Sequence, residues 1–189
     1  NGLKVIVTDR KIRKPEIDKG LEAGETIAPR VLASQALKLV NCPKGCKGYK
    51  LSNWNVKIEI IFYASAFRNN NFSKILVHEE HHFNTFKMCY NQIDEFWGSL
   101  FKGECEKESC TQAKIDLANA FAIERYEFFR SLELIFDRLD YDYSSLSISE
   151  TRRVFIHLNE QTAVTEAAWK KASETLNEAQ RKVKDECAN

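Results

Sequence analysis

Three of the four histidines of this 189-residue chain fall within five positions, in the stretch from Lys74 to Phe86. His78, Glu79 and His82 match the pattern H-E-x-x-H. On a helix, residues four apart project from the same face, so the two imidazoles could bind one Zn²⁺ ion. Glu79 follows the first histidine and could take a proton from a water molecule as general base. This spacing predicts a zinc-dependent peptidase that hydrolyses peptide bonds in a protein or peptide substrate, with cell-wall peptides among the candidates.

The other interpretation of the cluster is a polar, solvated helix face. Short motifs of common residues also arise by chance, so the pattern needs the structural context of a helix behind a strand. Within the cluster, His81 points about a hundred degrees away from His82, which places it off the proposed metal. We therefore predict that His81 and the neighbouring Glu80 take no part in the site.

A catalytic zinc usually takes three protein ligands and leaves one position open. Glu124 lies in the middle of an apolar stripe of the helix predicted from about Thr111 to Asp137. A carboxylate on such a stripe is costly to bury unless it is paired or binds a cation. Glu124 is therefore the predicted third metal ligand, and a salt bridge to an arginine or lysine of a neighbouring helix is the alternative.

His157, the remaining histidine, is the second candidate for the third ligand. If Glu124 binds the metal, His157 could instead donate a hydrogen bond to the oxyanion of the tetrahedral intermediate. Tyr141 and Tyr143 could serve the same purpose. The alternative for His157 is a structural histidine beside the apolar residues Val154 to Ile156.

The elements that must position these residues follow from the hydrophobic pattern. Strands are predicted at Leu3 to Thr8 and Trp54 to Tyr63, and helices at Glu25 to Val40, from a cap at Ser73, at Thr111 to Asp137 and at Ser149 to Cys187. The predicted fold class is α+β: a small N-terminal sheet with helices, one of them carrying H-E-x-x-H, and a mostly helical C-terminal half. We expect a single domain over residues 1–189, with a strand and helix lobe at 1–100 and a helical lobe at 101–189.

The order of helix, strand and H-E-x-x-H helix resembles the upper lobe of the zincin metallopeptidases. The resemblance implies that Trp54 to Tyr63 is the edge strand lining the substrate cleft, and that two histidines and a later glutamate bind zinc, as in gluzincins. The third histidine of metzincins is absent, since Met88 stands in its place. A further resemblance is to a family of predicted secreted bacterial zinc-dependent proteases of unknown function. The residues that carry it are His78 to Phe83, Tyr141-Asp142, His157, Gln161 and Trp169.

Six cysteines, at positions 42, 46, 89, 105, 110 and 187, predict three disulfides and an oxidising compartment. A zinc site built from Cys42 and Cys46 with Cys105 and Cys110 is the alternative, although neither spacing matches a zinc knuckle. A first residue other than Met also fits a chain that has lost a signal peptide. The protein is thus predicted to be secreted or periplasmic.

The charges restrict the partners. The 28 basic and 27 acidic side chains nearly cancel, so no global field would draw the protein to nucleic acid or to an anionic membrane, and binding must come from a local site. The longest apolar run, Ile60 to Phe67, is too short to span a bilayer.

The competing functional hypothesis is a non-catalytic secreted helical module for binding or inhibition, or a zincin-like protein that has lost activity. The pattern does not predict an oligomeric state.

Overall fold

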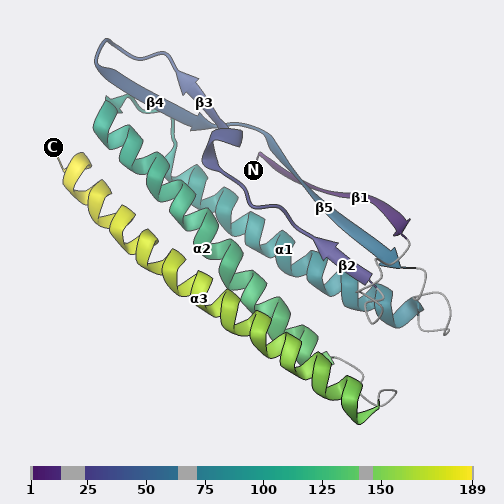
Figure 1. Ribbon diagram of the computed structural model, residues 1–189. Coiled ribbons are helices and arrows are strands. Elements are labelled where there is room, and N and C mark those ends of the chain that lie inside the picture. Colours follow the sequence, from purple (N-terminus) through teal and green to yellow (C-terminus); the bar gives the residue numbers. More distant parts are fainter. Residues whose placement is uncertain (1, 14–23, 64–71, 141–146, 189) are drawn as a thin grey trace.

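The computed structural model describes residues 2–13, 24–63, 72–140 and 147–188. These residues form an α+β fold, with the sheets in the N-terminal half and long helices after them, as the sequence predicts (Figure 1). The strands are β1 (Leu3–Arg13), β2 (Gly24–Ile27), β3 (Leu37–Val40), β4 (Cys46–Leu51), β5 (Trp54–Tyr63) and β6 (Glu106–Lys107). The helices are α1 (Phe72–Leu100), α2 (Glu108–Asp140) and α3 (Ile148–Cys187), with a short 3₁₀ helix, η1, at Ala33–Gln35.

The first sheet has the strand order β1-β5-β2, with β1 parallel and β2 antiparallel to β5. The alternating residues Val56, Ile58 and Ile60 of β5 are buried, which confirms the predicted strand. The same strand was predicted to be the edge strand, and this is wrong. β5 is paired on both sides and is therefore the central strand, and β2 is the edge strand nearest α1. The last residues of β5 are buried without alternation.

The helix predicted from Glu25 to Val40 is also wrong. The structure has β2, η1 and β3 there, and β3 pairs antiparallel with β4 in the second sheet, whose order is β3-β4-β6. The buried residues of the connecting segment, Ala28, Val31, Ala33 and Ala36, are spaced much as in a helix. Their burial comes from packing on α1 and α2, so tertiary contacts override the local pattern here.

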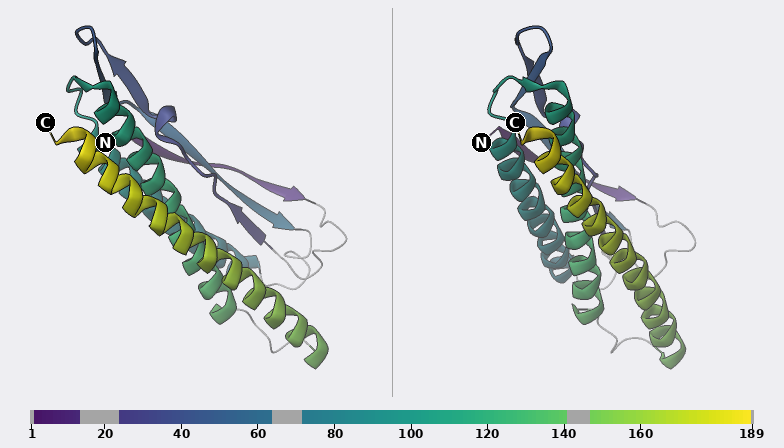
Figure 2. Two further views of the ribbon diagram at one scale, coloured as in Figure 1. Left: turned by 60° about the vertical axis from the view of Figure 1, so that its left-hand side comes forward. Right: turned by 90° about the vertical axis from the view of Figure 1, so that its left-hand side faces the viewer.

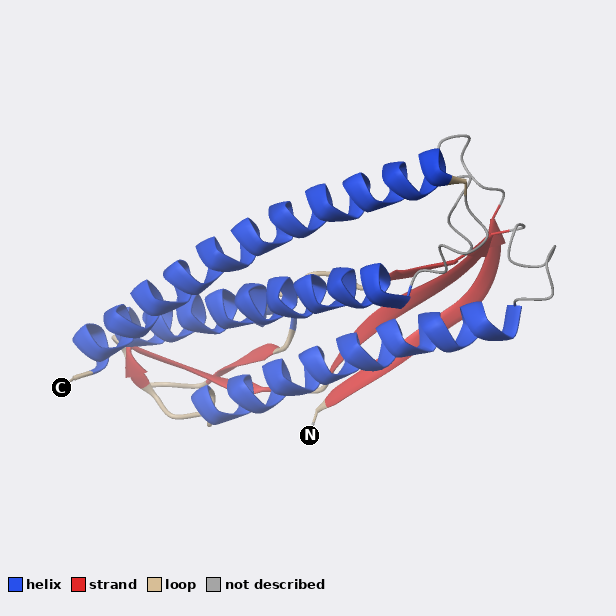
Figure 3. Ribbon diagram, turned by 90° about the horizontal axis from the view of Figure 1, so that it is seen from below, coloured by secondary structure: helices blue, strands red, loops and turns tan. Residues whose placement is uncertain are grey.

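The three long helices lie side by side, with the sheets along one side of them (Figures 2 and 3). α1 and α2 cover the sheets, and α3 packs along α2. Two buried tyrosines tie the segment after β2 to these helices: Tyr90 donates to the carbonyl of Pro29 at 2.6 Å, and Tyr126 donates to the carbonyl of Ala28 at 2.9 Å. β2 is thereby held against the face of α1 that carries Glu79.

Two disulfides are present, Cys42–Cys105 and Cys110–Cys187. The prediction of three is wrong, since Cys46 is unpaired and half-buried in β4 and Cys89 is unpaired in the core. The two bonds are consistent with a secreted or periplasmic protein. Among the described residues, no helix is long and apolar enough to cross a membrane.

Candidate metal centre

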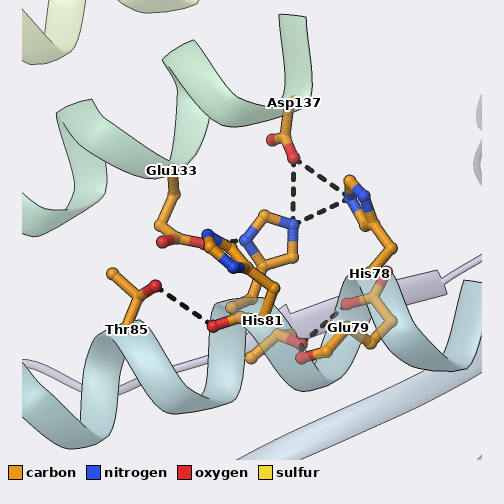
Figure 4. Close-up of polar contacts among 8 residues, drawn as sticks. His78, Glu79, His81, Thr85, Glu133 and Asp137 are labelled. Atoms are coloured by element: carbon orange, nitrogen blue, oxygen red, sulfur yellow. Dashed lines mark hydrogen bonds and ion pairs between the residues drawn. The ribbon is translucent and has the colours of Figure 1, made fainter. Parts of the chain in front are cut away.

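His78 and His82 lie one turn apart on α1. Figure 4 shows His78 facing the C-terminal part of α2, and the contacts of His82 with Glu133 and Asp137 place it against the same part. Their Nε2 atoms are 2.9 Å apart, with the two rings edge to face. His82 is buried and His78 is partly exposed, so the pair is open on one side. The prediction that the two imidazoles converge on one point therefore agrees with the geometry.

Asp137, near the end of α2, brings a carboxylate to the same point. Its Oδ1 atom lies 2.9 Å from His82 Nε2 and 3.2 Å from His78 Nε2. Burial by itself would raise the pKa of Asp137, but the two imidazoles outweigh it and hold that pKa below its usual value. Asp137 is therefore a carboxylate facing two ring nitrogens.

The three facing atoms fit a metal ion. Ligand atoms on a tetrahedral zinc at 2.0 to 2.1 Å are separated by roughly 3.3 Å, close to the spacings of this group. Asp137 Oδ1 is buried, and in the described part of the chain its polar neighbours are the two imidazole Nε2 atoms, so a cation between the three atoms would meet no competing group. His78, His82 and Asp137 are thus a group that could bind a metal ion.

Glu133 is a second carboxylate of α2 that contacts this group, through His82. It lies one turn before Asp137 on α2, it is buried, and its Oε2 atom contacts Nδ1 of His82 on the side away from Asp137. A histidine that binds a metal usually donates its second ring N–H to a carboxylate, which fixes the tautomer and the ring orientation. Glu133 is placed to do this for His82.

Replacing Glu133 with alanine should weaken metal affinity by about 10- to 100-fold without removing a ligand, because His82 loses its orienting carboxylate. Competition with a chromophoric chelator would measure the change. Glu127, another buried carboxylate of α2, is held by Arg30 and is the matched control. An unchanged affinity in Glu133→Ala would show that the contact with His82 has no part in metal binding.

Glu79 lies on the sheet side of α1, next to β2. It is buried, and its Oε2 atom accepts a hydrogen bond of 2.7 Å from the Thr26 hydroxyl. Burial raises the pKa of Glu79 above its usual value, although the Thr26 hydrogen bond and both imidazoles act in the opposite direction. The carboxylate thus lies within electrostatic reach of His78 and His82 and is held in one orientation.

The space for this carboxylate depends on Gly24. A Cβ atom at Gly24 would come within 2.5 Å of Glu79 Oε1, closer than two such atoms can approach. Gly24→Ala should therefore displace the carboxylate. If Glu79 is the general base predicted from the sequence, this variant should lower a hydrolytic rate by up to about 100-fold without loss of metal. The control is Gly98→Ala, whose Cβ would meet Leu51 at an ordinary 3.6 Å. Equal rates in the two variants, measured at saturating substrate, would contradict the role given to Gly24.

His81 and Glu80, predicted to be outside the site, are both exposed. The His81 ring stacks on Phe136 at 3.8 Å between centroids. Phe136 also contacts the rings of His78 and His82, so it covers one side of the histidine pair. His81 extends this aromatic cover and is not one of the three residues in the metal group.

Glu124, the predicted third ligand, lies elsewhere. It lies thirteen positions before Asp137 on α2, about 20 Å away along the helix axis. It is buried and accepts hydrogen bonds from Arg125 at 2.7 Å and from the Trp169 indole at 2.8 Å. The structure therefore has the alternative, a salt bridge, but the arginine is Arg125, the next residue of the same helix.

His157, the other candidate, is exposed on α3, where its Nε2 atom lies 2.7 Å from the Gln161 side-chain nitrogen. It is not part of the metal group. Tyr141, Asp142 and Tyr143 fall outside the described residues. Ser73, the predicted helix cap, lies within the first turn of α1, which begins at Phe72.

Glu133 and Asp137 were not found from the sequence. The available signal was a pair of acidic residues four apart among the apolar residues Leu132, Leu134, Ile135 and Phe136. This spacing puts both carboxylates on one face of a helix, just as the two histidines share a face of α1. The two helices thus present complementary i, i+4 pairs to each other.

Comparison of the chain with protein-family models, with curated proteins and with solved structures finds no match in any of the three.

Proposed function

We propose that the protein is a zinc-dependent peptidase that acts outside the cytoplasm, in which His78, His82 and Asp137 bind the metal. The observation that carries the proposal is the close approach of three metal-ligating atoms, from the two histidines of H-E-x-x-H and from one later carboxylate. Two imidazoles and a carboxylate are a donor set that zinc prefers, and three protein ligands leave room for substrate. The two disulfides support a secreted or periplasmic location.

Zinc held by His78, His82 and Asp137 would supply Lewis-acid chemistry, which is to polarise the scissile carbonyl and to make water acidic near neutral pH. Glu79 accepts the proton of the attacking water at its carboxylate and passes it to the leaving amine. The Thr26 hydroxyl keeps that carboxylate in place, and Glu133 holds His82 in the tautomer that offers Nε2.

The substrate class follows from the strand beside Glu79. β2 pairs with β5 on one side and is an edge strand among the described residues. An edge strand offers unpaired backbone groups to an extended peptide, which binds by main-chain hydrogen bonds. A peptide bound along β2 would pass the face of α1 that carries Glu79, so proteins and peptides in an extended conformation are the proposed substrates.

Removal of the metal tests this function. The purified protein without a histidine tag should contain about one zinc per chain. Dialysis against dipicolinate should abolish hydrolysis of fluorescein-labelled casein, and one equivalent of zinc should restore it. Activity that survives complete metal removal would refute the proposal. Zinc binding without hydrolysis of casein or of a mixed fluorogenic peptide library would instead indicate a metal-binding module without catalysis.

A further inference from the structure

Three lysines line up across the second sheet, at the end of the molecule where β3 and β4 lie (Figure 1). Lys38 of β3 is directly opposite Lys50 of β4, and Lys50 is in turn bridged to Lys102. Residues directly opposite in neighbouring strands point to the same face of the sheet. All three side chains are exposed, and together they form what we call the lysine row.

The lysine row is electrostatically unfavourable for the isolated protein. Like charges directly opposite each other in a sheet are destabilising. Nearby lysines have acidic partners, since Lys47 pairs with Glu108 and Lys114 pairs with Glu106. Within the described part of the chain, no ion pair is formed by Lys38, Lys50 or Lys102. The row is thus a set of uncompensated charges.

The sequence around the lysine row also has more basic than acidic residues. From residue 26 to residue 58 there are six basic residues and no acidic one, in a chain whose net charge is only +1. Two of the six, Arg30 and Lys47, pair with Glu127 and Glu108 from α2, which leaves four lysines. Lys44, in the connection between β3 and β4, adds to the charge at this end of the molecule. A local excess of one sign in a chain that is otherwise balanced is typical of contact with an oppositely charged partner.

The surroundings of the lysine row argue against a small anion as the partner. The cavity beside Lys102 and Glu104 has a volume of only about 10 Å³, which is too small for a phosphate or a sugar acid. The lysine row is an open surface, near the C-terminal end of α1, whereas the metal group is near the start of that helix, about 27 Å away along its axis. We propose that the lysine row docks the protein on a membrane surface of anionic phospholipid headgroups, which leaves the metal group at the opposite end free.

The proposal is independent of the proposed peptidase activity, and vesicle binding tests it. The full chain should sediment with vesicles of phosphatidylcholine containing 40 mol% phosphatidylglycerol at 50 mM salt, and not with phosphatidylcholine alone. Each lysine near such a surface contributes about fivefold in affinity, so Lys38→Gln, Lys50→Gln and Lys102→Gln combined should weaken binding by about 100-fold. Raising the salt to 0.5 M should abolish binding of the unmodified protein, because exposed charges are then screened.

The matched control removes the same number of charges elsewhere, with Lys87→Gln, Lys170→Gln and Lys171→Gln, all exposed on α1 and α3. It should bind like the unmodified protein. Equal losses in the two triple variants, or no binding of the unmodified protein at 50 mM salt, would overturn the proposal. Binding to soluble polyglutamate but not to vesicles would also overturn it and assign the row to an acidic chain. If the triple variant of the row self-associates while vesicles bind neither protein, the lysines only protect the edge of β3 from pairing.

Discussion

Asp137→Ala should abolish stoichiometric zinc binding, with an affinity loss well beyond the 10- to 100-fold expected for a residue that only orients a ligand. The reason is geometric: Asp137 Oδ1 is the one carboxylate oxygen within 3.2 Å of both imidazole Nε2 atoms in the described group. Isothermal titration of the metal-depleted variant would measure the loss. Circular dichroism would show that the helices are retained, since the side chain lies near the end of α2.

The matched control for this experiment is Glu124→Gln. Glu124 has the same charge and lies on the same helix, but it is bound by Arg125 and Trp169. Glutamine keeps the shape and can still accept the indole hydrogen bond, so zinc affinity should not change. Loss of zinc in Glu124→Gln, together with retention of zinc in Asp137→Ala, would mean that Glu124 is the third ligand, as the sequence predicts.

Glu79→Gln should lower the rate of peptide hydrolysis by about 100- to 10,000-fold while one zinc per chain stays bound. Glutamine preserves the size of the side chain and can accept the Thr26 hydrogen bond, but it cannot take a proton from water. The measurement pairs the turnover number on labelled casein with metal content from the same preparation. KM should change little, because Glu79 acts on the reacting water and not on the bound peptide.

Two outcomes would contradict this role. Loss of zinc along with activity would mean that Glu79 holds the metal group together. A rate within a fewfold of the unmodified protein would mean that another group takes the proton. Glu80→Gln is the control for position, since Glu80 is adjacent but exposed, and it should keep both zinc and activity.

The sequence was sufficient for the parts of the fold whose periodicity is strong. The helices that carry His78 and Asp137 are 29 and 33 residues long, and their apolar stripes were visible without a structure. Likewise, β5 alternates clearly over Val56, Ile58 and Ile60. The spacing of His78 and His82 fixed their common face once the helix was assigned, because four residues make about one turn.

The errors arise where long-range packing decides. The segment from Glu25 to Val40 has one proline, near its start, but Tyr90 and Tyr126 bind the backbone carbonyls of Pro29 and Ala28, which a helix would use for its own hydrogen bonds. The third ligand could not be predicted for the same reason. Glu124 and Asp137 both lie in apolar surroundings on α2, and only the register of α2 against α1 determines which of them meets the histidines. A sequence pattern does not contain that register.

The most direct test of the metal site is X-ray absorption at the zinc edge of the metal-loaded protein. A site built from His78, His82 and Asp137 predicts only nitrogen and oxygen neighbours at about 2.0 to 2.1 Å, with the outer-shell scattering of two imidazoles. Asp137→Ala should lose this spectrum. A sulfur neighbour at about 2.3 Å would instead place the zinc at an unpaired cysteine such as Cys46, and would contradict the account.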